Sequence, residues 1–350
     1  MKDDSSELLA EESGSQADRE APLPFAKRYP VVAGVCLGLV LRFIFSGPAG
    51  SAWSAMSGAF IFWTPIAIGM VTVYLAERVR RRTWGYYFWA PMLATALFVA
   101  GTLVIMIEGL ICAIVIIPMF SVLGAMGGLV MGITCRLTNW PKPAVYTLGA
   151  FPLLLGALGA ATPASNDFSH IERSIHIAAP PAVVWQALVH TPDIAPSEFE
   201  HGWAYRIGVP LPLSGEVVDT DGGKVRQFHM GKGVHFEGVV TDWQPQTFVR
   251  WTYRFKPDSF PAGALDDHVL IGGHYFDLLD TSYQLSPVAD GTRLTFKVHY
   301  RVSTQFNLYA SWVARMLLGN FGDVALAFYG GRSIAAVSTA PGRVTAGGAR

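Results

Sequence analysis

Charged residues, cysteines and histidines are scarce or unevenly placed in this chain of 350 residues. Only 15% of the residues are charged and 51% are hydrophobic, which is unusual for one water-soluble domain, and the length allows two domains. All three cysteines precede His170, and all nine histidines lie at or after it. The formal net charge is zero, so no nucleic-acid partner is expected. The two halves of the chain are therefore considered separately.

The sequence also lacks the short motifs of common catalytic and cofactor sites. It contains no Gly-rich phosphate loop, no nucleophile elbow, no Cys-x-x-Cys pair and no His-Glu-x-x-His. Its cysteines lie in apolar segments, which fits small buried side chains better than a disulfide framework. We therefore expect no metal and no cofactor, and the sequence assigns no catalytic residue.

Five apolar runs follow a polar N-terminal stretch. Residues 1–28 are polar and aperiodic, which predicts a disordered tail. Each run is near the ~20 residues needed to cross about 30 Å of hydrocarbon. The runs cover residues 30–47, 55–76, 86–107, 113–135 and 144–161. We therefore expect an all-α membrane domain, residues 29–161, with about five transmembrane helices.

Lysine and arginine gather in alternate connections between these runs. They precede the first run and follow the second and the fourth, whereas the other two connections contain none. Basic connections stay in the cytoplasm, so a complete fifth span would place the C-terminal half outside. This predicts a multi-pass inner-membrane protein with an extracytoplasmic domain. The fifth run is marginal, and if it enters the membrane only partway the C-terminal half stays cytoplasmic.

Small residues and two charges stand out within the membrane half. The spacing from Gly34 to Gly38, and from Gly124 to Gly132, indicates close packing of helices. Arg42 and Glu108 lie at or near membrane depth, where a charge is a candidate for function. Snorkelling, a loop position or a structural ion pair would also explain these two residues, and these alternatives remain open.

Residues 162–335 carry turn signals and period-2 alternation, which predict a strand-rich α+β domain. Strands are expected near residues 171–177, 224–230, 234–241, 248–255, 275–286 and 292–303. A short helix is expected at 180–190 and a long one at 305–329. Glycines at 319 and 322 predict a kink in the long helix, and Gly330–Gly331 its end. Residues 336–350 are expected to be a disordered tail.

Three stretches of this half resemble a known superfamily. They are SIHIAAPPAVVWQALV, VVTDWQPQTFVRWTYRF and TSYQLSPVADGTRLTFKVHYRV. They resemble the first strand and helix, the central strand and the last hairpin of the START-like, or SRPBCC, superfamily. The resemblance implies a helix-grip fold, in which a curved antiparallel sheet wraps a long C-terminal helix around a cavity. The superfamily includes lipid carriers, hormone and allergen-type binders, and polyketide cyclase-like enzymes, so the resemblance identifies no ligand.

Strand alternation sorts the side chains of the sheet into an apolar face and a polar face. The apolar face should meet the long helix and line the cavity. Its candidate ligand-binding aromatics are Phe228, Phe236, Trp251, Tyr253, Tyr283 and Tyr300. No Asp, Glu or His shares this face, which favours binding of a hydrophobic molecule over acid–base catalysis.

The stretch FHMGKGVHF predicts a hairpin that turns about Lys232. In this register Arg226 points inward opposite Gly238, where a guanidinium could hold a carboxylate or phosphate head group. Snorkelling to the sheet edge, or pairing with a structural acid, would be the alternative roles of Arg226. The same register gathers histidines 229 and 235 with Glu237 on the polar face. Such a set can ligate a transition metal, but a polar outer face needs no metal.

A long loop, PDSFPAGALDDHVLIGGHYFD, follows the strand at 248–255. Its length and glycines suit a lid over a pocket, so Asp267 and His268 are included among the candidate ligand-contacting residues. An alternative is a cyclase- or hydrolase-like enzyme that uses this loop, including Asp266, with Tyr253 or Tyr300. A third hypothesis is an envelope sensor or assembly module.

The preferred interpretation is a membrane-anchored START-like protein. Its partners would be the lipid bilayer and a hydrophobic or amphipathic small molecule, such as a lipid, bound between sheet and helix. The sequence predicts no oligomeric state.

Overall fold

The structure is a computed structural model that describes residues 29–138, 146–157, 164–265, 268 and 270–339. The chain divides into two compact units, Met1–Pro163 and Ala164–Arg350. The tail predicted at 1–28, and residues 340–350 of the predicted C-terminal tail, lie outside the described residues. So do Asp266 and Asp267 of the predicted lid.

The first unit is helical throughout its described elements. These are α3 (Pro30–Ile44), the π-helix η1 (Ala59–Trp63), α4 (Thr64–Glu77), α5 (Trp84–Val104), α6 (Leu110–Leu137) and α7 (Tyr146–Ala157). Among the described residues, three helical segments are long and apolar enough to cross a membrane, namely Ala59–Glu77, Trp84–Val104 and Leu110–Leu137. α3 has 15 residues, or about 22 Å of helix, which is shorter than a hydrocarbon core. Five complete spans therefore remain a prediction.

Glycines bring the helices of this unit into backbone contact. A Cβ atom at Gly69 of α4 would lie 2.0 Å from the carbonyl oxygen of Gly124 on α6. One at Gly34 would lie 2.3 Å from the Thr72 hydroxyl, and one at Gly128 would lie 2.3 Å from Pro91. Only hydrogen fits at these points, so the small-residue spacings serve helix packing, as predicted.

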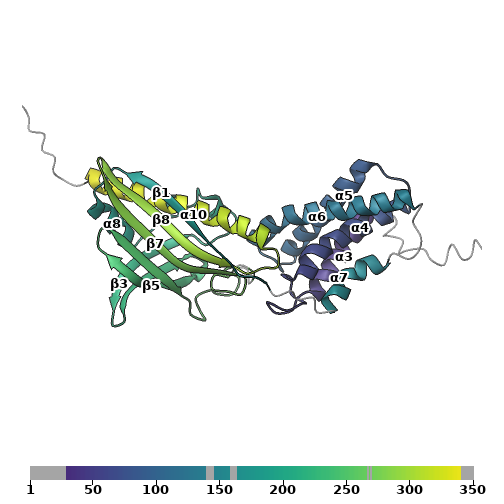
Figure 1. Ribbon diagram of the computed structural model, residues 1–350, viewed down its shortest axis with the longest axis horizontal. Helices are drawn as coiled ribbons and strands as arrows, with labels where there is room; N and C mark the ends of the chain where they lie inside the picture. The colour runs from purple at the N-terminus through teal and green to yellow at the C-terminus, as the bar shows by residue number, and fades with distance from the viewer. Residues whose placement is uncertain (1–28, 139–145, 158–163, 266–267, 269, 340–350) are drawn as a thin grey trace, which may run out of the picture. The chain divides into compact units, whose positions relative to one another are not determined.

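The second unit is a curled antiparallel sheet with helices packed against it (Figure 1). The sheet has eight strands in the order β1-β8-β7-β6-β5-β4-β3-β2. They are β1 (Asp167–Ile177), β2 (His190–Thr191), β3 (Pro212–Thr220), β4 (Gly223–Met230), β5 (His235–Gln244), β6 (Phe248–Arg254), β7 (Phe276–Val288) and β8 (Gly291–Val302). The helices are α8 (Pro181–Val189), α9 (Trp203–Arg206) and α10 (Asn307–Thr339), with 3-10 turns η2 (Pro196–Glu198) and η3 (Gly231–Gly233). The strand order and the long C-terminal helix are those of the helix-grip fold, as predicted.

The long helix α10 is continuous where the sequence predicted a kink and an end. Figure 1 shows it lying along the sheet beside β1, and it runs unbroken to Thr339. A Cβ atom at Gly322 would lie 2.8 Å from the Phe296 ring of β8, and one at Gly319 would lie 2.9 Å from the Arg173 guanidinium of β1. These glycines therefore let α10 approach the sheet closely, and tertiary packing overrides their low helix propensity.

The strand register places several chain segments at one end of the sheet, here called the loop end. Asp167, the first residue of β1, pairs with Val302, the last residue of β8. Phe276, the first residue of β7, pairs with Val302 as well. The 255–275 loop, the β4–β5 turn at 231–233 and the start of α10 therefore all lie at the loop end.

Candidate functional site

Arg226 is a buried cation at the centre of the second unit. Its side chain projects inward from β4 and the residue is 2% exposed. Nη1 donates to the carbonyl oxygen of Leu188 on α8 at 2.7 Å. Nη2 donates to the hydroxyl of Tyr329 on α10 at 2.9 Å. One guanidinium thus joins the sheet to both helices that pack on it.

Only neutral groups surround this guanidinium among the described residues. Its carbon lies 4.9 Å from the Trp251 ring centroid and 5.2 Å from that of Phe228. No described carboxylate forms an ion pair with it, and its Nε atom has no hydrogen-bond partner there. Arg226 therefore neither snorkels to the edge nor pairs with a structural acid, the two alternative roles considered from the sequence. A buried positive charge that keeps a free donor suits an anion.

The hairpin register predicted from the sequence is confirmed. Phe228 pairs with Phe236 and Arg226 pairs with Gly238. The space above Gly238, however, is filled by the Trp251 indole, because a Cβ atom there would lie 2.7 Å from Trp251 Cδ1. Room for the guanidinium comes instead from Gly215 of β3, where a Cβ atom would lie 3.0 Å from Arg226 Nη2.

Two buried tyrosines, Tyr283 and Tyr329, lie beside Arg226. The rings of Tyr283 and Tyr329 meet edge to face at 5.6 Å. Burial first, and then the neighbouring Tyr329, raise the pKa of Tyr283 and of Tyr205 well above the ordinary tyrosine value. The hydroxyls of Tyr205 and Tyr300 are buried and have no hydrogen-bond partner among the described residues. At neutral pH the phenols of Tyr283 and Tyr205 are therefore protonated donors, and neither is a base.

A second aromatic cluster lies toward the loop end of the same face. The rings of Phe228 and Phe236 stack at 4.8 Å, and Phe260 of the 255–275 loop stacks on Phe236 at 6.4 Å. The backbone N–H of His235 donates to the carbonyl oxygen of Ser259 at 3.0 Å, which fixes the loop to β5. The first part of the loop thus covers this cluster, as the lid hypothesis expected of it.

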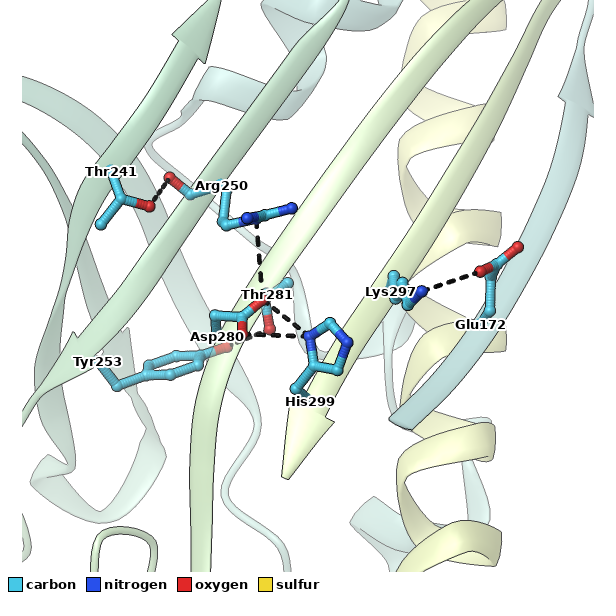
Figure 2. Close-up of polar contacts among 8 residues, drawn as sticks. All are labelled: Glu172, Thr241, Arg250, Tyr253, Asp280, Thr281, Lys297 and His299. Carbon is cyan, nitrogen blue, oxygen red and sulfur yellow. Dashed lines mark hydrogen bonds and ion pairs between the residues drawn. The ribbon is translucent and has the colours of Figure 1, made fainter. Parts of the chain in front are cut away.

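Tyr253 belongs to this cluster and has a polar partner on the adjacent strand. Its hydroxyl is 2.7 Å from the Thr281 hydroxyl of β7 (Figure 2). Burial raises the pKa of Tyr253, although the Thr281 hydrogen bond opposes this shift. The two hydroxyls form a polar spot within an otherwise apolar wall.

The opposite face of the sheet is a ladder of ion pairs. Figure 2 shows the Asp280 carboxylate directed at His299, with an oxygen 3.0 Å from Nδ1, and Arg250 nearby at 3.9 Å. Lys297 pairs with Glu172 at 3.6 Å. These groups are partly exposed and pair among themselves, so they explain the polar side of the alternation without a ligand.

The set of His229, His235 and Glu237 is also engaged locally. Glu237 accepts from Lys256 at 2.7 Å and from Arg254 at 2.6 Å, and these two cations lower its pKa. A depression of about 210 Å³ is lined by Gln227, Phe228, His229, His235, Phe236, Glu237, Arg254, Lys256 and Ser259. No cluster of three metal-binding side chains occurs in the part of the chain that the structure describes.

The described members of the predicted lid do not form a catalytic cluster. Asp258 lies 3.6 Å from His235 in an ion pair on the polar side of the hairpin. Asp277 is in register with Arg301, and burial raises its pKa although Arg301 lowers it. The ring of His268 is 6.4 Å from that of Tyr275. Asp267 and Asp266 lie outside the described residues.

The sequence did not single out Tyr329, Tyr205 or the Leu188 carbonyl. A helical repeat does carry the signal for Tyr329, since Gly322, Leu326, Tyr329 and Ser333 are all buried. The role of Leu188 involves only its backbone, and no side-chain pattern marks it.

Several charged side chains of the first unit have defined partners. Arg42 Nε lies 2.7 Å from Glu108 Oε1, so the ion-pair interpretation is the one that the structure shows. Glu77, which the sequence did not single out, is buried at the end of α4. It accepts from the Tyr87 hydroxyl at 2.9 Å and from the Arg82 backbone N–H at 2.7 Å.

No known protein family and no curated protein matches this chain in sequence. Solved structures resemble it over about half its length. The Zhui aromatase/cyclase from Streptomyces sp. R1128 is 13% identical, with a TM-score of 0.32, over 51% of this chain and 100% of that one. A Staphylococcus aureus protein of unknown function is 13% identical, with a TM-score of 0.33, over 50% and 99% of the two chains. The di-domain aromatase/cyclase BexL from the BE-7585A pathway is 14% identical, with a TM-score of 0.31, over 59% and 61%.

Likeness at these levels adds nothing about ligand or activity. The second unit is a helix-grip domain by its own strand order, curled sheet and long C-terminal helix. Fold alone does not determine what such a domain binds, so the site must supply that argument.

Proposed function

We propose that the second unit binds an amphipathic small molecule, whose anionic group contacts Arg226 and whose apolar body lies among the aromatic side chains. The observation that carries the proposal is the Arg226 guanidinium, which is 2% exposed and has only neutral partners among the described residues. A charge in such surroundings loses its hydration, and an anionic ligand restores a favourable partner. A carboxylate is the simplest group that fits a guanidinium in two-pronged geometry.

Two further buried hydroxyls of the same domain are candidate donors to an anion. The hydroxyls of Tyr205 and Tyr300 are buried without partners among the described residues. A phenol hydroxyl that has no other partner can donate a hydrogen bond to an anionic group. The proposal includes no chemical step, because the described residues on the inward face of strands β4 to β8 include no Asp, Glu or His that could move a proton.

The first unit serves as a membrane anchor in this proposal. Three of its helical segments have the length and hydropathy of membrane spans. Together with α3 and α7 they form a multi-pass anchor in the inner membrane, and the second unit is extracytoplasmic. Anchoring would hold the second unit close to the bilayer, into which hydrophobic ligands partition. The support for this arrangement is the apolar composition of the first unit and the basic residues in alternate connections.

The binding proposal is tested with two ligands that share a naphthalene ring and differ in the head group, which is an anionic carboxylate in one and a neutral alcohol in the other. Full-length protein in lipid nanodiscs is titrated at neutral pH with naphthoate and with naphthalenemethanol. We expect naphthoate to bind about 10-fold or more tightly, since hydrogen bonds to charged groups contribute about 1.5–3 kcal/mol. Isothermal titration calorimetry gives both dissociation constants.

Two variants make this test specific to the site. Arg226→Gln should remove the preference for naphthoate. Arg250→Gln removes an exposed arginine on the polar face and should keep the preference. Equal affinities for the acid and the alcohol in the unmodified protein would contradict the proposal.

A further inference from the structure

One face of α10 exposes large apolar side chains in its first three turns. Leu308 is 94% exposed, Trp312 is 55% exposed and Met316 is 44% exposed. Their spacing of four residues aligns them along one side of the helix, and they are called the α10 stripe here. Further along, the exposed residues at 323, 327 and 331 are Asp, Ala and Gly, and large exposed apolar side chains recur near the helix end, at Ile334 and Val337.

The composition of the α10 stripe suits the surface of a lipid bilayer. Tryptophan favours the boundary between headgroups and acyl chains, because its indole is apolar with one polar N–H. Leucine and methionine provide the apolar area that inserts below the headgroups. Arg315 lies beside the stripe and is exposed, so its positive charge can pair with the phosphates of lipid headgroups.

Covalent connectivity gives the α10 stripe access to a bilayer. The first residues of the second unit are fixed to the start of α10, because Asn307 Nδ2 donates to the Ser165 carbonyl oxygen at 2.6 Å. Ser311 likewise donates to an Asp167 carboxylate oxygen. Seven residues, 158–164, separate Ser165 from Ala157, the last residue of α7. Eight Cα–Cα steps span at most about 29 Å, whatever path they take.

We propose that the α10 stripe docks on the bilayer that holds the first unit, so that the loop end of the sheet faces the lipid. The occupant of this face is a phospholipid surface. The inference rests on the membrane anchoring in the proposed function and adds the route of the ligand. An amphipathic molecule then passes between bilayer and grip at the loop end, next to Phe260 and Tyr253, with little exposure to water.

Photo-crosslinking in the full chain tests the docking. The protein is reconstituted into vesicles of phosphatidylethanolamine and phosphatidylglycerol with benzoylphenylalanine in place of Leu308, and separately in place of Ala327. Both sites are exposed on α10, so the substitutions disturb no packing. After irradiation, we expect mass spectrometry to detect a phospholipid adduct in the variant substituted at position 308. The adduct yield of the variant substituted at position 327 should be much lower.

Each other outcome overturns the proposal. Equal lipid adducts at both positions would show unspecific contact. A cross-linked dimer from position 308 would show that a second copy covers the stripe. An adduct within the same chain, or no adduct at either position, would show that lipid does not touch it.

The docking and the binding proposal can fail separately. The double variant Leu308→Ser and Trp312→Ser should keep the naphthoate preference, since neither residue is buried near Arg226. The variant Arg226→Gln should keep the lipid adduct at position 308. If no lipid adduct forms at position 308 while the protein still prefers naphthoate, docking alone is refuted. If the adduct forms but naphthoate is not preferred, only the assigned ligand is refuted.

Discussion

At the scale of single residues, α4 and α6 of the first unit can pack closely because Gly69 has no Cβ atom at their contact. Gly69 of α4 lies against the Gly124 backbone of α6, with no space for a methyl group. Gly85, near the start of α5, has no atom within 4 Å of the position where its Cβ would lie. The two glycines therefore form a matched pair, one at a tight contact and one in open space.

We predict that Gly69→Ala destabilises the first unit and that Gly85→Ala does not. The methyl group at position 69 would force α4 and α6 apart, at a cost of about 1–3 kcal/mol, as overpacking does. At position 85 it should change the free energy of unfolding by about 1 kcal/mol or less, in the stabilising direction. Thermal unfolding followed by circular dichroism in detergent micelles gives both values. Equal Tm values for the two variants would contradict this account of the helix contact.

Arg226 shows what a sequence can and cannot predict about one residue. Its inward direction followed from strand alternation and the turn at Lys232, which are local features, and the pairing of Arg226 with Gly238 was confirmed. Its partners, Leu188 and Tyr329, are 38 and 103 residues away in the chain. Contacts over such separations depend on how α8 and α10 pack on the sheet, and no short pattern encodes that.

At the scale of elements, regular alternation was a reliable guide and short or glycine-containing elements were not. The strands at 224–230, 248–255 and 292–303 were predicted close to their observed bounds. β3 was missed, because Ser214 and Gly215 interrupt its alternation and its pairing with β4 is what defines it. The glycines of α10 were interpreted as breaks, whereas they bring the helix close to Phe296 and Arg173.

Local sequence pattern predicted part of the candidate site as well. Phe228, Phe236 and Tyr253 form the predicted aromatic wall, because period-2 alternation determines which face a strand residue occupies. The 255–275 loop was predicted to be a lid from its length. Phe260 stacks on Phe236 of this wall, and the lid role remains a prediction. Whether these residues contact a ligand remains a prediction, and so does any role of His268.

At the scale of the whole molecule, the proposed orientation of the chain in a membrane rests on the placement of its basic residues. Lys27 and Arg28, the arginines at 78–82, and Arg136 with Lys142 all belong to alternate connections of the sequence. If all five apolar runs cross, these connections lie in the cytoplasm and the second unit lies outside. We predict that alkaline phosphatase fused after Arg350 is active and that a fused fluorescent protein, which matures in the cytoplasm, is dark. The reverse pattern would show that one apolar run does not cross.

The central claim is that the grip holds an anionic amphipathic molecule on Arg226. The most direct measurement is mass spectrometry of small molecules extracted from the purified full-length protein and from Arg226→Gln, prepared in parallel. The account predicts an amphipathic acid or phosphate ester in near-stoichiometric amount from the unmodified protein, and at least a 10-fold reduction in the variant. A neutral molecule retained equally by both proteins, or none in either, would contradict it.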